Sequence, residues 1–383
     1  TTLTVAGTSS GSKGMLEVFE YTLANALSVA TLNVNAYGVL THGANTDDDQ
    51  DNILNIDATT ITIAENGEVN VDEKGHPGGI ISARDGYGPG GGGYDSGQGG
   101  GGGHYGAGGT ENNGTGSGTG LYCSPTDPQT MGSGGGSSGH SSYPGEPGGG
   151  LAYLMASGTA TIAGTISADG GGKVSASTAS DPGGGAGGGI NVQANDINFS
   201  GTITSDGGDV DEYGGGGGGG CAFLGHTGSI VNTGSTSVAG GGGYGAGGAA
   251  GNFNVSSLNS VPAVDTTPAL SSQTTDGLGK VTFTVGVSDP DDDPLEVKVD
   301  YTTDGGVSWY RTYLDSVTPS YGATPSISNG AYDSADGQFD TVDTTSGENT
   351  LTMVWDSQYS AATYTPITTE PATVQIRVTL DDG

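Results

Sequence analysis

The stretch from Gly148 to Val255 places blocks of consecutive glycines between short runs of alternating apolar and polar residues. Each run turns on a single glycine, as in Ile162-Ala-Gly164-Thr-Ile166 and Phe199-Ser-Gly201-Thr-Ile203, and Gly234 is the third such pivot. The pivots recur every thirty-odd residues, a period typical of a solenoid, in which a unit buries its apolar face only against its neighbours. The stretch therefore predicts a stacked β architecture and not a catalytic pocket.

The runs predict strands because their apolar residues recur at every second position and are mostly β-branched. A helix would also lose about 1 kcal/mol for each interior glycine relative to alanine. Only Gly14–Leu27 can be written as a helix, but its apolar residues, Met15, Leu16 and Val18 among them, fit a buried strand as well. We therefore expect an all-β chain.

The repeat extends toward the N-terminus, because Gly38 and Gly67 also stand as pivots between strand-like runs. We expect a glycine-rich β-solenoid over residues 29–255, with a strand segment at 1–28 and a glycine-rich insertion at 86–147. Ordered glycine runs need close neighbours, so the insertion is expected to form extended three-fold glycine helices packed on one another.

The glycine blocks and turns such as GTISADGGG, over about residues 29–255, resemble the glycine-rich parallel β-helix and polyglycine-helix sections of bacterial surface proteins and phage adhesins. This resemblance implies an architecture more than an activity.

A different pattern begins after the segment 256–267, which reads as a linker. Apolar residues alternate with polar ones in Val281–Val287 and Leu295–Tyr301, and the turn Asp304-Gly305-Gly306 leads to Trp309, a candidate for a buried tryptophan. Such a pattern predicts a β-sandwich over 268–383. The string VSDPDDDPLEVKVDYTTDGGVSW resembles bacterial immunoglobulin-like or fibronectin-type repeats of large surface proteins.

The charge balance excludes several partners. The chain has 8 Lys and Arg against 42 Asp and Glu, a net charge of −34, whereas nucleic acids and anionic membranes attract basic surfaces. No apolar run is long enough for a membrane span. Acidic, lysine-poor chains rich in Thr, Ser, Asn and Gly are common outside the cell. There, Cys123 and Cys221 can form one disulfide, and two buried free thiols are the alternative.

Carboxylates suggest one cofactor, Ca²⁺, which prefers six to eight oxygen ligands. Asp289, Asp291 and Asp293 crowd one loop of the sandwich, with Asp292 and Glu296 beside them and Asp381-Asp382 near the chain's end. The alternative is a solvated acidic turn shaped by prolines. Asn45–Asp51 has the same ambiguity and no EF-hand spacing. The five histidines lack zinc-site spacing, and no glycine run has the context of a phosphate loop.

These patterns favour a non-enzymatic structural protein. We expect copies of it to assemble with one another into an extracellular cell-surface filament, which is a homopolymer. Thr1–Gly7 is a candidate donor strand, with Leu3 and Val5 filling a groove of the next subunit, because the sandwich pattern stops after VQIRVTLDDG without a closing strand. The alternative is a monomeric adhesin that binds glycans or a cell surface. An ice-binding protein built on polyglycine helices and a β-helix lyase are further alternatives.

Overall fold

The computed structural model describes residues 1–19, 21–80, 82–95, 97–112, 114, 116–139, 143–172, 181–211, 213–243, 245–258, 262–274, 278–289, 294–329, 338–344, 347–360, 366–367 and 373–381. These residues contain 24 strands and no helix, which confirms the all-β expectation. The chain divides into two compact units, Thr1–Ser257 and Leu258–Gly383.

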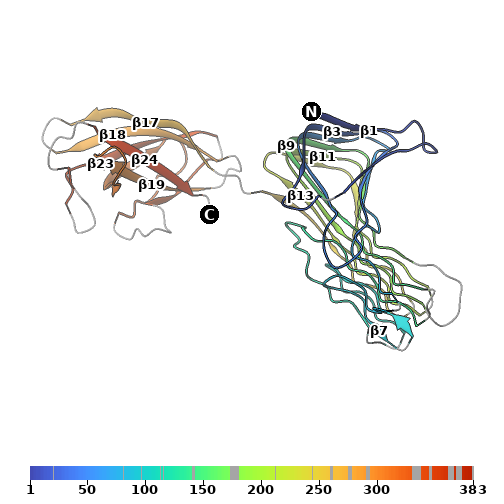
Figure 1. Cartoon of the computed structure of the whole chain (residues 1–383). Helices are drawn as coiled ribbons and strands as arrows, with labels where there is room; N and C mark the ends of the chain where they lie inside the picture. Colours follow the sequence, from blue (N-terminus) through green and yellow to red (C-terminus); the bar gives the residue numbers. More distant parts are fainter. Residues whose placement is uncertain are drawn as a thin grey trace. The chain divides into compact units, whose positions relative to one another are not determined.

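The first unit is a β-solenoid of six coils (Figure 1). In each coil a strand of an eight-stranded parallel sheet turns a corner into a short strand of a six-stranded parallel sheet. The coils are β1 (Thr2–Val5) with β2 (Gly14–Val18); β3 (Leu27–Val34) with β4 (Gly38–His42); β5 (Leu54–Ile63) with β6 (Glu68–Asn70); β9 (Leu151–Ile162) with β10 (Thr165–Ser167); β11 (Gly189–Phe199) with β12 (Thr202–Thr204); and β13 (Cys221–His226) and β14 (Ile230–Asn232) with β15 (Ser235–Ser237). A last strand, β16 (Asn252–Ser257), pairs with β13.

The core lies between the two sheets and consists of apolar ladders that run from coil to coil. Register pairs Val5 with Val34, Val34 with Ile63, and Ile63 with Ile162. On the facing sheet, Val69, Ile166 and Ile203 stack in the same way. All of these side chains are at most 5% exposed, and full burial of one such side chain stabilises the fold by about 1.5–3 kcal/mol.

The N-terminal segment belongs to the solenoid, so the expectation of a separate segment 1–28 with a free donor strand is wrong. Strand β1 pairs in parallel with β3, and β2 with β4, which places the first coil before residue 29. Val5 is buried, and Leu3 packs against the same core. The preference for a strand over a helix at the start of Gly14–Leu27 is confirmed by β2.

Below the sheets the glycine blocks form a lattice of extended segments. In Gly215–Gly220 the backbone N–H groups donate with period three to three neighbouring segments: Gly215 and Gly218 to Gly99 and Gly102, Gly216 and Gly219 to Ala246 and Ala249, and Gly217 and Gly220 to Gly208 and Ser205. A three-fold helix directs every third N–H the same way. The expected polyglycine helices are therefore confirmed, and the insertion 86–147 contributes some of them, including the segment around the small hairpin β7 (Tyr94–Asp95) and β8 (Gln98–Gly99).

The lattice requires glycine because the segments lie at backbone contact. A Cβ on Gly217 would overlap the carbonyl group of Gly185, and a Cβ on Gly101 would overlap that of Gly216. Buried N–H and C=O groups are costly unless they are paired. The lattice pairs them between segments and so replaces a conventional side-chain core.

Aspartates join successive coils where the short strands pass into the lattice. Asp72 accepts the N–H of Asp169 at 2.8 Å through Oδ1, and Asp169 accepts the N–H of Asp206 at 2.7 Å. Asp206 then accepts the N–H of Ala239 at 2.6 Å. Each carboxylate thus satisfies a backbone donor of the following coil.

The second unit is a sandwich of two antiparallel sheets around its own core. One sheet holds β17 (Ala263–Gln273), β18 (Lys280–Ser288), β23 (Asn349–Asp356) and β21 (Leu314–Pro319); the other holds β20 (Tyr310–Arg311), β19 (Leu295–Thr302), β22 (Phe339–Val342) and β24 (Gln375–Asp381). The buried tryptophan is Trp355, whereas Trp309 is half-buried, with the Arg377 guanidinium 4.4 Å from the centre of its ring. The linker is shorter than the expected 256–267, because β16 ends at Ser257 and β17 begins at Ala263.

Candidate functional site

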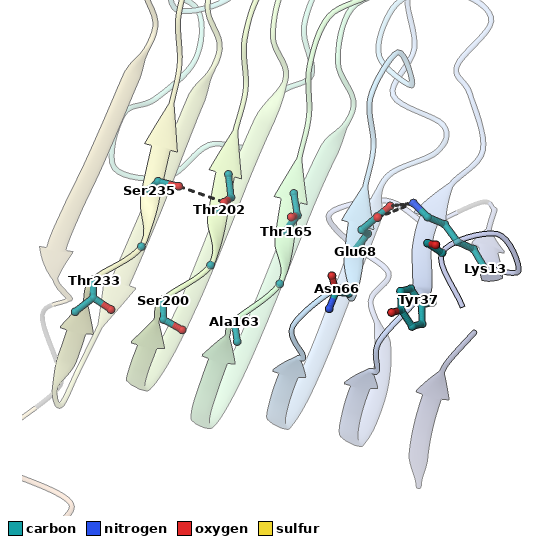
Figure 2. A pocket seen from close by; sticks show the side chains of 14 residues that line it. Lys13, Tyr37, Asn66, Glu68, Ala163, Thr165, Ser200, Thr202, Thr233 and Ser235 are labelled. Carbon is teal, nitrogen blue, oxygen red and sulfur yellow. Dashed lines mark hydrogen bonds and ion pairs between the residues drawn. The ribbon is translucent and has the colours of Figure 1, made fainter. Parts of the chain in front are cut away.

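A groove of about 590 Å³ crosses the corners of the solenoid, along the direction in which the coils stack (Figure 2). Its floor and walls come from equivalent positions of successive coils. The lining residues are Ser10, Lys13, Tyr37, Asn66, Glu68, Ala163, Gly164, Thr165, Ser200, Gly201, Thr202, Thr233, Gly234 and Ser235.

The groove exists because the corners shorten partway along the stack. The second coil turns through the three residues 35–37 and the third through the four residues 64–67. Hydrogen bonds from the Gly38 N–H to the Asn35 C=O and from the Gly67 N–H to the Ala64 C=O close these turns. The next three coils turn through only two residues, 163–164, 200–201 and 233–234. The longer corners therefore form a wall at one end of a floor made by the shorter ones.

The predicted pivot glycines lie at these corners. A Cβ on Gly201 would overlap the Gly164 carbonyl oxygen, one on Gly164 would overlap that of Gly67, and one on Gly234 would overlap the Phe199 ring. The coils touch through backbone at Gly164 and Gly201 and against the Phe199 ring at Gly234, and the pivots themselves carry no side chain. The pivots thus make the floor of the groove.

The end wall holds two residues in an uncommon backbone conformation. Tyr37 and Asn66 precede the pivots Gly38 and Gly67 and have φ angles of 61° and 60°. A left-handed conformation is uncommon for a residue other than glycine, although Asn tolerates it better than most. In Figure 2, Tyr37 and Asn66 are neighbours at the end of the row of corner residues.

The lining is polar but nearly neutral. Among the described residues that line the groove, only Lys13 and Glu68 are charged, and the Lys13 Nζ lies 2.6 Å and 2.7 Å from the two Glu68 carboxylate oxygens. Hydroxyl groups of Thr165, Thr202 and Ser235 follow one another on neighbouring strands, with 3.2 Å between the oxygens of the last two. Such a surface suits an uncharged ligand rich in hydroxyl groups.

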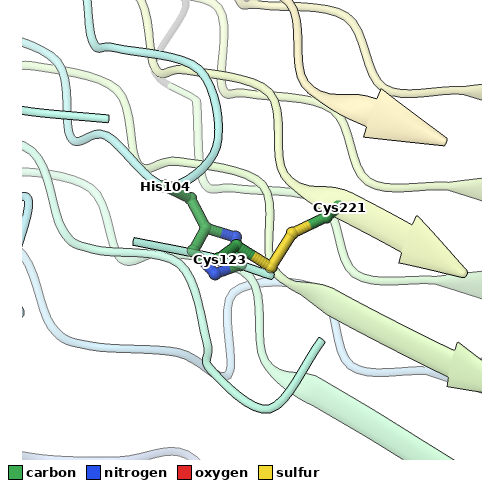
Figure 3. A group of neighbouring side chains, drawn as sticks. All are labelled: His104, Cys123 and Cys221. Atoms are coloured by element: carbon green, nitrogen blue, oxygen red, sulfur yellow. A yellow bond between two sulfur atoms is a disulfide. The ribbon is translucent and has the colours of Figure 1, made fainter. Parts of the chain in front are cut away.

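A second cluster lies at the top of the glycine lattice, where the structure joins Cys123 and Cys221 in a disulfide beside His104 (Figure 3). All three side chains are buried. Burial lowers the pKa of His104 to about 4, so its imidazole is neutral at physiological pH. Among the described residues, only this trio is close enough together to hold a metal ion. Its sulfur atoms are bonded to each other, however, and cannot act as thiolate ligands.

The disulfide fastens one segment of the insertion, 121–131, to the outer face of the long sheet; we call it the clamp segment. The Tyr122 hydroxyl donates to the Met131 carbonyl oxygen at 3.0 Å, and Asp127 accepts from Asn191 at 2.8 Å. Met131 forms a small separate core with Ile53 and Leu151. Sequence reasoning anticipated the cysteine pair but missed His104, because no spacing motif links it to either cysteine.

The other carboxylates singled out in the sequence belong to the sandwich and to the loop 45–51. Asp289 is buried, while Asp291, Asp292, Asp293 and Asp382 lie outside the described residues. Glu296 and Asp381 are opposite each other on β19 and β24. In the loop 45–51, Asn45 closes the turn by bonding the backbone of Asn52 and Lys74, and Asp48 accepts the N–H of Gly88. These hydrogen bonds tie the loop to Lys74 and to Gly88 of the insertion.

Fold and sites together define an all-β protein with a glycine-rich parallel solenoid and an antiparallel sandwich. Comparisons with family models, with curated proteins and with solved structures give no match. Within the described part of the chain, no helix is long and apolar enough to cross a membrane.

Proposed function

We propose that the chain is an extracellular, non-enzymatic binding module of the adhesin type, which holds a neutral carbohydrate chain in the corner groove. The observation that supports it best is the groove's hydroxyl-lined and nearly uncharged surface in a protein of net charge −34. The acidic composition and the disulfide favour a location outside the cytoplasm.

The chemistry of the lining suits sugars in two ways. Ser, Thr and Asn side chains both donate and accept hydrogen bonds, as sugar hydroxyls do. The Tyr37 ring at the end wall offers an apolar face with a polar tip. Since equivalent positions recur at the spacing of parallel strands, about 4.8 Å, an elongated ligand meets similar groups along its length.

Binding of neutral oligosaccharides, screened on a glycan array and measured by calorimetry, tests this proposal. Tyr37→Asn removes the ring but keeps a residue that tolerates a positive φ, and Thr202→Lys fills the groove. Each change is expected to weaken binding at least about tenfold, or 1.4 kcal/mol. Thr350→Lys, on an exposed position of the sandwich, is the matched control. Failure of the parent to bind any neutral glycan, or equal binding by both groove variants, would refute the proposal.

A structural role in a cell-surface filament is the second candidate. It is supported by the two ends of the solenoid: among the described residues β1 pairs only with β3, and β16 only with β13 in the long sheet. Such edges are templates for pairing with another chain. A head-to-tail contact between them would add coils without closing into a ring.

We also propose that Ca²⁺ binds the acidic loop of the sandwich through Asp289, Asp291 and Asp293. The support is compositional, because oxygen-rich loops suit this ion. Chelation should then lower the melting temperature of the second unit in the full chain. An unchanged melting curve at all chelator concentrations would leave the solvated-turn interpretation.

A further inference from the structure

The outer face of the long sheet carries a regular array of threonines on its first four coils. The array, here called the threonine face, has two rows that cross β1, β3, β5 and β9, neighbouring strands of one sheet. Figure 1 labels β1, β3 and β9 of this sheet. Thr4, Asn33, Thr62 and Thr161 form one row in continuous register. Thr2, Thr31 and Thr60 form the other, which continues to Thr159 beside a register shift between β5 and β9.

The array points away from the core. Its residues alternate along each strand with the buried side chains of the inner ladders, for example Thr60 and Thr62 with Ile61 and Ile63. Thr2 and Thr4 are exposed and the other members are half-buried. Within the described part of the chain, the seven threonine hydroxyls make no hydrogen bond, so they are available to a ligand.

The two rows themselves are uncharged, although the chain as a whole has a net charge of −34 and the exposed Asp57 lies on the same face of β5 just outside them. All eight positions hold threonine or asparagine, and the first carboxylate in these rows is Asp196, on the fifth coil opposite Thr159. Charge complementarity therefore favours a neutral partner. The clamp segment covers a different part of the same sheet, around Tyr153 and Asn191.

The spacing of the array is fixed by the backbone. Neighbouring strands lie about 4.8 Å apart, and side chains two residues apart on a strand about 6.6 Å. Threonine is stiff at χ1, so the hydroxyls and methyls repeat on a lattice with little rotamer freedom to lose. A rigid lattice in which seven of eight positions hold the same group matches a partner that is itself a lattice of oxygen atoms.

We infer that the threonine face binds ice. Hexagonal ice presents neutral oxygen atoms in rows whose repeats are close to those of a parallel sheet. The methyl groups exclude disordered water while the hydroxyls join the ordered layer. A soluble glycan is a poorer match here, because the rows hold no aromatic ring. This inference is independent of the proposed carbohydrate groove, since the two surfaces share no residue.

Thermal hysteresis and crystal shape, measured with the oxidised full chain in a nanolitre osmometer, test the inference. The parent is expected to produce faceted crystals and a gap between melting and freezing that grows with protein concentration. Thr62→Lys combined with Thr161→Lys places two charged side chains on neighbouring strands of the array and should abolish the gap between melting and freezing. Thr350→Lys makes the same change on the other unit and should leave the gap unchanged.

Round crystals and no gap with the parent at millimolar concentration would overturn the inference, whatever the variants do. It would also fail if the double variant kept the full gap. Circular dichroism and melting curves establish that the double variant is folded. If it is not, Thr161→Lys alone takes its place, with the same loss expected. Adsorption of the parent to crystalline cellulose or chitin without any effect on ice would identify a polysaccharide surface and refute ice.

Discussion

At the scale of single residues, glycine acts by allowing backbone to touch backbone. Gly201 shows this at the corner of the fifth coil, where a Cβ would overlap the Gly164 carbonyl oxygen. The atoms that this Cβ would meet belong to the main chain of Ala163 and Gly164, which cannot move aside as the end of a side chain could. Packing at the corners therefore depends on glycine at the pivot itself.

Replacing Gly201 by valine is expected to destabilise the solenoid by about 1–3 kcal/mol, the usual cost of forcing atoms into a packed site. Gly11→Ala is the control, because a Cβ there meets nothing within 4 Å. Urea unfolding of both variants and the parent measures the effect. Equal midpoints for Gly201→Val and the parent would show that the corner is not closely packed.

The aspartates between coils make the free energy of unfolding of the solenoid depend on pH. Burial is the main cause that raises the pKa of Asp169 to about 6, and the nearby Asp72 and Asp206 carboxylates raise it further. Because this folded-state pKa is above the usual 3.8, the folded chain holds the proton more tightly than the unfolded chain. The stability from Asp169 is thus fully present below about pH 4 and is lost as the pH rises through about 6.

Asp169→Asn should remove that dependence while leaving an oxygen to accept the Asp206 N–H. After allowance for solvent screening, the fall in unfolding free energy between pH 4 and pH 7 should shrink by about 1 kcal/mol. Urea titrations at several pH values measure it. Asp196 has the opposite effect on stability: hydrogen bonds from Ser229 lower its pKa, so the stability it contributes is lost as the pH falls. Asp196→Asn should remove that contribution. Parallel pH profiles for Asp169→Asn and the parent would contradict the assignment.

At the scale of elements, the clamp segment is an irregular piece of chain held on the long sheet by one covalent bond and a few polar contacts. Cys123 and Cys221 are 98 residues apart, and their Cα atoms are 6.6 Å apart in the fold. Closing a loop of this length restricts the unfolded chain strongly. The disulfide therefore contributes to the stability of the insertion as well as fixing its place.

Cys123→Ser combined with Cys221→Ser is expected to lower the unfolding free energy by about 2–4 kcal/mol. A non-reduced digest of native protein should contain the cross-linked peptide that joins the two cysteines. Reduction of the parent should shift its melting curve to that of the double variant. Recovery of two alkylatable thiols from native material would contradict the pairing.

The sequence predicted the repeating elements well, because each rests on a local rule. Period-two runs became strands, and the pivots Gly38, Gly67, Gly164, Gly201 and Gly234 lie at equivalent corners. It did not predict that Thr1–Gly7 joins the first coil. Strand pairing is non-local, and a longer loop separates β1 from Gly14, the residue in register with the pivot Gly38. The groove was missed for a similar reason: corner length matters only once the coils are stacked. His104 likewise reaches the cysteines only through the lattice.

At the scale of the whole molecule, the long sheet of the solenoid has two edge strands, β1 and β16. The β1 edge decides how copies of the chain could join into a filament. Donor-strand exchange through Leu3 and Val5 is no longer a suitable mechanism, because both side chains already pack in the core of their own coil. Changing them to aspartate would unfold that coil and so could not report on assembly. End-to-end stacking instead needs only the main-chain groups on the open edge of β1.

The register identifies those groups. The carbonyl oxygens of Thr1 and Val5 accept hydrogen bonds from the backbone of β3 and of Asn35 just beyond it. In a parallel ladder, a residue's N–H and C=O point to the same side, and the side alternates along the strand. Thr2 and Thr4 therefore direct their N–H and C=O groups toward the open edge. A second copy stacked through its β16 would pair there.

Thr4→Pro removes one outward donor without disturbing the hydrogen bonds to β3, since proline is tolerated on an edge strand. If filaments form by end-to-end stacking, this variant should remain monomeric under conditions in which the parent polymerises, as seen by negative-stain microscopy and sedimentation velocity. Thr4→Val keeps the N–H and should polymerise like the parent. Filaments from Thr4→Pro would show that another surface joins the subunits, and a parent that stays monomeric at high concentration would rule out self-assembly and leave the adhesin proposal alone.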